Sequence, residues 1–538
     1  MKKSLALLLG IVIGVALSIP AFAASPVEFE GYVKVYHENL HNFQRNYEKG
    51  YDDDSFFWNR LNIKVTFQPS DAVKVVWQFR APDNYRWGQR SPNTTAATRA
   101  VYGELNFDWG TIRGGRIIDG LPGTVGGLAS LGYAPSWGAD GLLYNNIFDY
   151  NTPVDALTYD NKWDLSNGHK FGLAVYYDKL ASNWSRSWDN SATGGNSGRG
   201  LNNDYAYDDN GWFTESHIGG PLELPKDADY DIFGVEATYE WETGGASLGV
   251  EYQRNATSQV SKEWALFLNP AFVQSFGPFA IHFEGKIGWG KKEYNREYIL
   301  AGDWTRFANA VLQVPDWNGT IRNKGLGLYL DGVYTYDQGD VTLSGWYVSG
   351  TDLNTDRTSL NSLVTLGDFA PFLVAFNDTT LGRGYFSNNL GTGVYDGTDF
   401  NGQTRNINTG YNEGTKNQWG IAILGHQTIV PDFITLNYGI GYFRLVKPTF
   451  YWIQRADGGW NQDVFTAPGQ TVKPQSKDLG WEIDLGFSFQ IFENVYFDTQ
   501  FGYMFNGSAY DDWDPAGAGS WKSAKDTFAW ANVLAFQF

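Results

Sequence analysis

The sequence predicts an all-β fold, a transmembrane antiparallel β-barrel of roughly 16 to 18 strands. Three observations lead to this prediction. Apolar side chains alternate with polar ones over segments of about ten residues, which is the length a tilted strand needs to cross a bilayer. Aromatic residues make up 17% of the 538 residues and 63 residues are glycine, which is a composition of strands and turns. Short and long connections also alternate along the chain.

The first segment predicts export. Lys2 and Lys3 precede an apolar run from Leu5 to Ile19, and Ala21-Phe22-Ala23 is a small-x-small cleavage pattern. We therefore expect a signal peptide over residues 1–23 and a single barrel domain over residues 24–538. No later stretch approaches the roughly 20 apolar residues of a membrane-spanning helix.

Charge and cysteine content exclude several functions. The formal net charge is −19, whereas a nucleic-acid partner requires excess Lys and Arg. The chain has no cysteine, so disulfides and thiolate metal sites are excluded. We expect no cofactor and no nucleic-acid partner.

The strands follow from the period-two pattern. In residues 479–490, Trp481, Ile483 and Leu485 share one face, while Glu482 and Asp484 share the other. About eighteen such segments can be placed. They begin near residues 27, 55, 71, 99, 110, 154, 169, 230, 246, 263, 279, 326, 340, 417, 433, 478, 494 and 526.

The connections predict an orientation. Short turns occur at Pro69-Ser70, Trp109-Gly110, Ser166-Asn167-Gly168, Glu242 to Gly245, Asp337 to Asp340 and Glu493-Asn494. Between them lie long loops at 38–54, 118–153, 179–229, 290–325, 350–416 and 446–477. This alternation predicts an even strand number with both termini on the short-turn side. The alternative is a secreted β-sandwich, β-helix or propeller, which would have shorter strands and no such alternation.

The last strand ends in an apolar row. Phe528, Trp530, Leu534, Phe536 and Phe538 share its outward face, which is interrupted at position 532 by Asn. This ending resembles the C-terminal strand by which outer-membrane proteins are recognised for insertion. The resemblance implies a Gram-negative outer membrane, the barrel-assembly machinery as a partner, and Phe538, Phe536 and Leu534 as the assembly signal.

Residues 55–180 carry a second resemblance. "RLNIKVTFQPSDAVKVVWQF" at 60–79 and "AVYGELNFDWGTIRGGR" at 100–116 are similar to the second to fifth strands of the trimeric general porins. "DGLPGTVGG" at 119–127 resembles their constriction loop, and "DALTYDNKW" at 155–163 resembles the strand after it. The resemblance implies a homotrimer and a third external loop, residues 117–153, that folds into the lumen. Asp119 and Asp140 are the candidate constriction-loop acids.

The parity of the strands predicts which charges face the lumen, because charges are costly on the lipid face. A basic wall is expected from Arg60, Lys64, Lys74, Arg80 and Arg116. An acidic wall is expected from Glu236, Glu251, Glu284, Asp331, Glu482, Asp484 and Asp498. Such walls would create a transverse field and, since the acids outnumber the bases, a mild preference for cations. Alternatively, these charges are simply hydrated, or the arginines hold the loop in place.

These features predict an outer-membrane porin, a water-filled channel for passive diffusion of ions and small hydrophilic solutes. One alternative is a substrate-specific channel for sugars or carboxylates, in which lumenal aromatics such as Tyr102, Tyr176, Tyr329, Trp346 and Tyr496 would guide the solute. Another is a non-conducting barrel that acts as a scaffold or adhesin.

An enzyme is not expected. The six histidines are scattered, and no pattern places a nucleophilic serine beside one of them. Acidic clusters at Asp52 to Asp54, Asp208-Asp209 and Asp511 to Asp514 are candidates for surface divalent cations that bridge lipopolysaccharide, although solvated acids are the ordinary state of such clusters. Outer-membrane lipid and lipopolysaccharide are the expected lipid partners.

Overall fold

The structure is a computed structural model. It describes residues 27–41, 54–80, 85–86, 97–117, 128–131, 133, 154–181, 230–256, 261–294, 320–351, 359–361, 364, 371–373, 417–448, 451–463, 469–514 and 519–538. The predicted signal peptide and the greater part of the long loops lie outside these residues.

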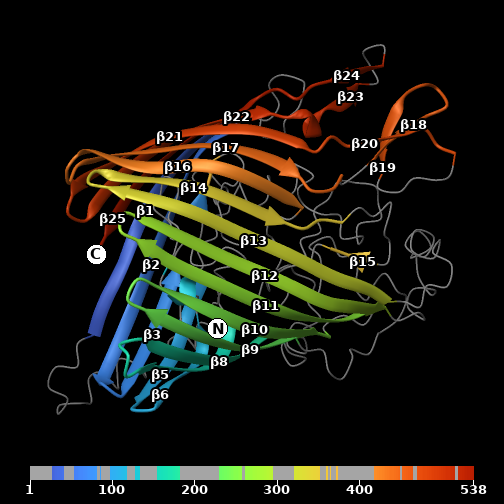
Figure 1. Cartoon of the computed structure of the whole chain (residues 1–538). Helices are drawn as coiled ribbons and strands as arrows, with labels where there is room; N and C mark the ends of the chain where they lie inside the picture. Colours follow the sequence, from blue (N-terminus) through green and yellow to red (C-terminus); the bar gives the residue numbers. More distant parts are fainter. Residues whose placement is uncertain are drawn as a thin grey trace, which may run out of the picture.

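A closed antiparallel barrel of 18 strands forms the body of the molecule (Figure 1). Each strand pairs with its neighbour in the sequence. The barrel strands are β1 (Val27–His41), β2 (Asp54–Ser70), β3 (Val73–Arg80), β5 (Ala97–Phe107), β6 (Gly110–Ile117), β7 (Val154–Asp164), β8 (Lys170–Ala181), β9 (Tyr230–Trp241), β10 (Gly244–Asn255), β11 (Ser261–Phe276), β12 (Phe279–Tyr294), β13 (Thr320–Tyr336), β14 (Gly339–Val348), β16 (Gln418–Val430), β17 (Ile434–Leu445), β21 (Asp478–Phe492), β22 (Val495–Asn506) and β25 (Thr527–Gln537).

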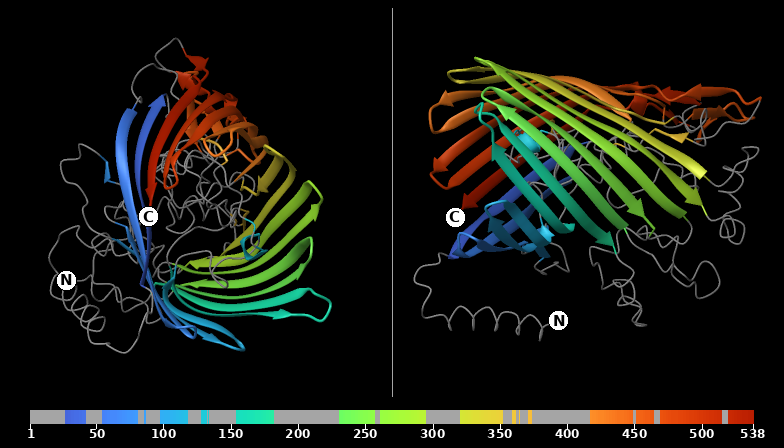
Figure 2. Two further views of the ribbon diagram at one scale, coloured as in Figure 1. Left: turned by 90° about the vertical axis from the view of Figure 1, so that its left-hand side faces the viewer. Right: turned by 60° about the horizontal axis from the view of Figure 1, so that its bottom comes forward.

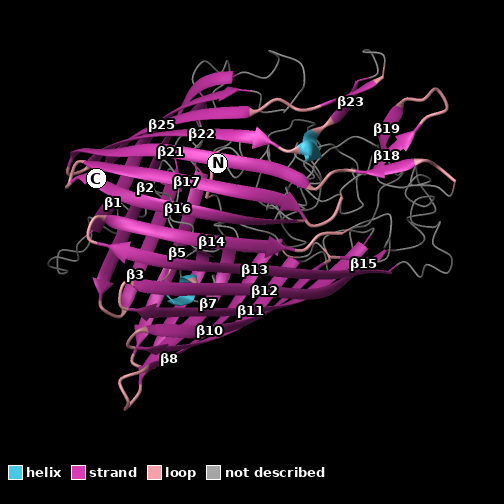
Figure 3. Ribbon diagram, turned by 45° about the horizontal axis from the view of Figure 1, so that its top comes forward, coloured by secondary structure: helices cyan, strands magenta, loops and turns pink. Residues whose placement is uncertain are grey.

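Shorter elements are added to this barrel (Figure 3). The two-residue strand β4 (Tyr85–Arg86) pairs antiparallel with β2, and the two-residue strand β15 (Ser359–Leu360) pairs parallel with β13. Two small sheets, β18 (Tyr451–Gln454) with β19 (Trp460–Asp463) and β20 (Val472–Pro474), and β23 (Asp512–Asp514) with β24 (Ser520–Lys522), lie in the last two long connections. The described helices are single 3₁₀ turns, η1 (Ala129–Leu131) and η3 (Ser508–Tyr510). No helix in the described ranges has the length and apolar character to cross a membrane.

The first and last strands close the barrel. β1 pairs antiparallel with β25, and Gly31 and Phe538 exchange two backbone hydrogen bonds of 2.8 and 3.0 Å. Gly31 is required here because a Cβ atom would lie 2.8 Å from the Phe538 ring and 2.5 Å from the Asn62 carbonyl oxygen. Closure leaves no free sheet edge. Such an edge would be costly in a bilayer because lipid cannot hydrogen-bond its backbone N–H and C=O groups.

The connections confirm the predicted alternation of short and long. Two- or three-residue turns join the strand pairs at 71–72, 108–109, 242–243, 277–278, 337–338, 431–433 and 493–494, and a five-residue turn occupies 165–169. All of them lie at one end of the barrel, where the C-terminus also lies, while the small sheets lie at the other end (Figure 1). Gly277, with φ of 63°, and Asp432, with φ of 58°, supply the left-handed conformation that such tight turns need.

Parity sorts the side chains between two environments. Outward-facing apolar side chains such as Phe29, Leu157 and Leu330 are more than half exposed. Polar side chains on the alternate positions are buried inside, and strands surround this interior on all sides when the barrel is viewed along its length (Figure 2). An apolar exterior around a polar interior is the reverse of a soluble protein and is the arrangement of a membrane-spanning barrel.

Candidate functional site: a charged lumen with two infolded segments

Basic side chains line the lumenal face of the early strands. The pairing of β1, β2 and β3 aligns Lys34 with Arg60 and Asn62 with Arg80, all on the face opposite the exposed apolar row. Lys64 pairs with Glu30 at 3.1 Å, and Lys74 pairs with Glu104 at 3.0 Å. Arg60, Lys64, Lys74 and Arg80 therefore have the parity that the sequence predicts.

Arg116 lies on the opposite face from these residues. The register pairs Arg116 with Val101 and Asp155, which are outward-facing, and its Nη1 lies 3.5 Å from Asp155 Oδ1. Arg113 takes the lumenal position instead. This buried guanidinium binds Glu104 at 2.7 Å and also binds Asp160. The prediction for Arg116 must be corrected because the Gly114-Gly115 pair gives no apolar alternation from which to read the parity.

Sequence analysis did not identify Glu104 and Asp160, although the hairpin could have indicated the first of them. The turn at Asp108-Trp109 makes Phe107 and Gly110 a pair, and counting back from it pairs Glu104 with Arg113. Because these acids neutralise part of the basic wall, its net positive charge is smaller than the sequence suggested.

Acidic side chains line two parts of the lumen, β9 to β13, around the barrel from the basic strands, and β21 with β22, close to the seam with β1. All seven predicted acids have lumenal parity, and six are buried: Glu236, Glu251, Glu284, Asp331, Glu482 and Asp484. Asp498 is half-buried. Lys286 lies among them, with its Nζ 4.9 Å from the centre of the Phe267 ring. Buried carboxylates need hydrogen-bond donors, because an unpaired charge away from water is costly.

A short segment of the β6–β7 loop supplies several donors. The backbone N–H of Leu128 donates to Glu284 at 3.0 Å, the hydroxyl of Ser130 donates to Glu236 at 2.6 Å, and the hydroxyl of Tyr133 donates to Asp331 at 2.8 Å. These partners lie on β12, β9 and β13, three to seven strands around the barrel from β6. We call residues 128–131 and 133 the first infolded segment. Its position agrees with the predicted inward fold of this loop, while Asp119 and Asp140 lie outside the described residues.

Tyr133 holds this segment in place through both its ring and its hydroxyl. Its ring stacks on His282 with centroids 3.6 Å apart, and His282 Nδ1 lies 2.5 Å from Asp331 Oδ1. Tyr329 also donates to Asp331, at 2.6 Å. Burial and the adjacent Asp331 carboxylate raise the pKa of Tyr133 well above its usual range, so its hydroxyl stays protonated and keeps donating.

A second segment enters the lumen from the β14–β16 loop, and sequence analysis did not predict it. Phe372 and Leu373 are buried, and the N–H of Leu373 donates to Asp484 at 2.7 Å. The Phe372 ring packs edge-on against Phe443 at 5.2 Å and lies over Gly439 and Gly441 of β17. We call residues 371–373 the second infolded segment.

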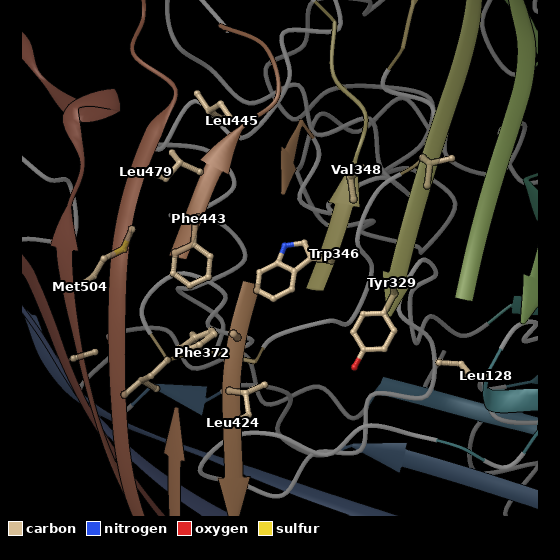
Figure 4. Close-up of a cluster of buried hydrophobic side chains, with 14 of the residues drawn as sticks. Leu128, Tyr329, Trp346, Val348, Phe372, Leu424, Phe443, Leu445, Leu479 and Met504 are labelled. Atoms are coloured by element: carbon tan, nitrogen blue, oxygen red, sulfur yellow. The ribbon is translucent and has the colours of Figure 1, made fainter. Parts of the chain in front are cut away.

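The two segments belong to one buried apolar cluster inside the barrel. Figure 4 shows Phe372 beside Phe443 and Leu424, with Leu128 near Tyr329 on the other side of Trp346. Tyr329 and Trp346 are thus packed in this cluster. The remaining aromatic candidates have the predicted lumenal parity, and Tyr176 donates to Glu251 at 3.1 Å. The lumen is therefore part charged and part apolar.

Other candidate sites gain little support. Within the described ranges, no group of three or more His, Asp or Glu side chains could hold a metal ion. His426 lies 3.2 Å from Asp340 on β14, and His37 lies on the outward face of β1. Of the three acidic clusters, residues 52–53 and 208–209 lie outside the described residues.

Comparisons with known proteins give structural matches. No protein-family model and no curated protein matches the chain. Solved structures similar to it include OccK2 (OpdF) of Pseudomonas aeruginosa, at 8% identity, with a TM-score of 0.44 and coverage of 95% of this chain and 98% of that chain. OccK8 (OprE) of the same species is 9% identical, with a TM-score of 0.43 and coverage of 95% of this chain and 98% of that chain. The anion-selective porin from Comamonas acidovorans is 10% identical, with a TM-score of 0.36 and coverage of 96% of this chain and 100% of that chain.

With identities and TM-scores this low, the fold assignment rests on the strand pairing described above. A closed barrel with an apolar exterior and short turns at one end is the architecture of integral outer-membrane proteins of Gram-negative bacteria. This agrees with the localisation that the sequence predicts.

Proposed function

We propose that the protein is an outer-membrane porin through which ions and small hydrophilic solutes diffuse without chemical change. The observation that supports this most directly is the lumen itself, with Arg60 and Arg80 on one wall and Glu284 and Asp331 on the other. A field between such walls orients polar solutes and filters them by charge. Among the described residues of the two walls, no serine or threonine stands in a grouping typical of a nucleophilic catalyst.

The first infolded segment is the proposed constriction. Three hydrogen bonds and the Tyr133–His282 stack hold it against the acidic wall, so carboxylates that would otherwise attract cations serve as acceptors for the loop. The proposed pore-lining residues are then Arg60, Lys64, Lys74, Arg80 and Arg113, together with Glu251 on β10 and with Glu482 and Asp498 on β21 and β22, which are near the basic strands through the seam. We expect the mild cation preference to persist because the acids outnumber the bases in the whole chain.

A substrate-specific channel is the second candidate. The second infolded segment favours it, because Phe372 and Leu373 occupy lumenal space next to Asp484 and leave less of the cross-section for unselective diffusion. Packing of this kind is typical of a pore shaped for one class of solute.

Recordings in a planar lipid bilayer test the proposal. Purified protein should give stepwise conductance in plain salt if it is a porin. Block by a low concentration of one solute class, such as a carboxylate or a sugar, would indicate the specific channel. Absence of any conductance would contradict both the porin and the specific channel, and the non-conducting scaffold would remain as the explanation. A homotrimer, proposed from the porin resemblance, would be checked by native mass spectrometry.

A further inference from the structure

The outward face of β8 to β13 carries two parallel rows of side chains near the long-loop end. The strand register aligns the first row across five strands, from Tyr177 through Phe233, Tyr252 and Leu266 to Trp289. All but Tyr177 are more than a third exposed. Aromatic side chains in such a row sit at the level of the lipid headgroups. We call it the girdle row.

The second row lies two residues closer to the loops on each strand. Register aligns Lys179 with Asp231, Asp231 with Arg254, Arg254 with Trp264, Trp264 with Lys291, and Lys291 with Arg322. On the same face, Lys262 lies one step further toward the loops, paired with Glu293, and Lys324 lies level with Trp289 of the girdle row. We call this set the rim row. Its members are Lys179, Asp231, Arg254, Lys262, Trp264, Lys291, Arg322 and Lys324.

The charge of the rim row contrasts with that of the chain. Six bases stand in it beside two outward acids, Asp231, which binds Lys179 at 2.7 Å, and Glu293, which binds Lys291. The chain as a whole has a net charge of −19. Lys262, Arg322 and Lys324 are exposed. A local excess of positive charge on an acidic protein attracts an anionic binding partner.

The position of the row identifies where that neighbour lies. Two residues of a strand span about 7 Å, so the rim row lies one step beyond the girdle row, at the depth of lipid phosphates. The opposite end of the same strands differs. Phe276, Phe279 and Tyr334 form its outward aromatic border, and the described outward positions there hold no Lys or Arg. Only the end facing the outer leaflet is basic.

We propose that the rim row is a binding site for the phosphate groups of a phosphorylated glycolipid of the outer leaflet, of the lipid A type. Arg254 and Arg322 can bind a phosphate through two N–H groups, and Lys262, Lys291 and Lys324 add point charges. Trp264 stands between the two arginine strands and offers an aromatic face to a sugar ring. The proposal rests on the outer-membrane residence above, and it is independent of whether the lumen conducts.

The test is binding of diphosphorylated lipid A to the detergent-solubilised full chain, followed by native mass spectrometry. The Lys291→Gln/Arg322→Gln variant is compared with Lys447→Gln/Arg455→Gln, which removes the same charge from exposed residues beyond β17. Two lost charges at about fivefold each should weaken binding roughly 25-fold in the first variant and leave it unchanged in the second. Lipid A without phosphates should not bind the wild type.

Equal binding by wild type and the rim variant, or equal binding of phosphorylated and phosphate-free lipid, would overturn the site. Displacement by equimolar inorganic phosphate would show a free-anion site and overturn the glycolipid assignment. The folded state of each variant is checked by its heat-dependent gel mobility, and Lys262→Gln/Lys324→Gln is the substitute if the first variant does not fold. A wild type that binds lipid A but passes no current would disprove the porin proposal and leave the rim site intact.

Discussion

Asn532 on the last strand donates a hydrogen bond from its Nδ2 to Nδ1 of His37 on the first strand, over 3.0 Å. The two residues face each other across the seam of the barrel, on its outward side. His37 Nε2 lies 3.2 Å from the Ser55 hydroxyl, and the ring packs against Phe57 and Trp530. The polar residue that interrupts the apolar row of the closing strand is therefore one half of a pair.

Replacing one member of this pair should weaken the seam. Asn532→Leu leaves a ring nitrogen of His37 without its donor in an apolar setting, at a cost of about 1–3 kcal/mol. The double variant His37→Leu/Asn532→Leu should recover most of that loss because both polar groups are gone. The midpoint of urea unfolding, followed by tryptophan fluorescence in detergent, measures both. A double variant no more stable than the single one would contradict the pairing.

Ion selectivity should depend on Arg80 and not on Arg116. Arg80 faces the lumen, whereas Arg116 lies outward beside Asp155. A charge about 4 Å from an ion in water contributes about 1 kcal/mol, repelling a cation and attracting an anion, so Arg80→Gln should raise the cation-to-anion permeability ratio by at most about 30-fold. Reversal potentials across a salt gradient measure this ratio, with Arg116→Gln as the matched control. A shift in the control and none in Arg80→Gln would reverse our assignment of faces.

Removing the Tyr133 hydroxyl should loosen the first infolded segment. Tyr133→Phe keeps the stack on His282 but loses the hydrogen bond to Asp331, which is worth about 1.5–3 kcal/mol for a charged acceptor. We expect larger current fluctuations in the open channel. Ser508→Ala, a hydroxyl loss in η3 outside the lumenal wall, is the control. Unchanged current noise in Tyr133→Phe would mean that the hydroxyl does not hold the segment.

Alkaline pH should have a similar effect on the wild type. The pKa of Tyr133 is raised in the docked state above its value of 10.0 when exposed, so docking is fully stable below about pH 10 and weakens as the pH rises further. Current noise should therefore increase above pH 10 in the wild type and less in Tyr133→Phe. An identical alkaline response in both proteins would assign the effect to other groups, such as lysines.

Displacing the second infolded segment should widen the pore. A Cβ atom at Gly441 would lie 2.5 Å from the Phe372 ring, so Gly441→Val should expel that ring from its place. Phe372→Ala removes the same packing by truncation, a loss of about 3–5 kcal/mol for a buried Phe. Both should raise the single-channel conductance. Gly332→Val, where a Cβ meets nothing within 4 Å, is the control. Conductance that does not change in either variant would show that the segment lies outside the path of ions.

The barrel could be predicted because each spanning strand repeats the same chemical alternation. Every predicted strand corresponds to one in the structure. The largest displacement is at β13, which begins at Thr320 and not near 326. Arg322 and Lys324 follow Thr320 on its outward face, so the apolar pattern starts only where the strand enters the hydrocarbon.

The site was less accessible to sequence analysis. The lumenal acids Glu284 and Asp331 could be identified because they alternate with long apolar side chains such as Phe283 and Leu330. Arg113 and Arg116 stand beside glycines that carry no such pattern. The docking of Phe372 depends on the space above Gly439 and Gly441, which is a relation between distant parts of the chain that no local spacing indicates.

The seam between β1 and β25 also has a consequence for biogenesis. The pairing that joins Gly31 to Phe538 unites the first and the last strands of the barrel in chain order. A nascent chain cannot close the barrel before β25 has been synthesised. A premature stop anywhere before β25 would leave two sheet edges with unpaired backbone N–H and C=O groups. Until β25 is paired, the exposed edge strands can pair between molecules, which is a route to aggregation.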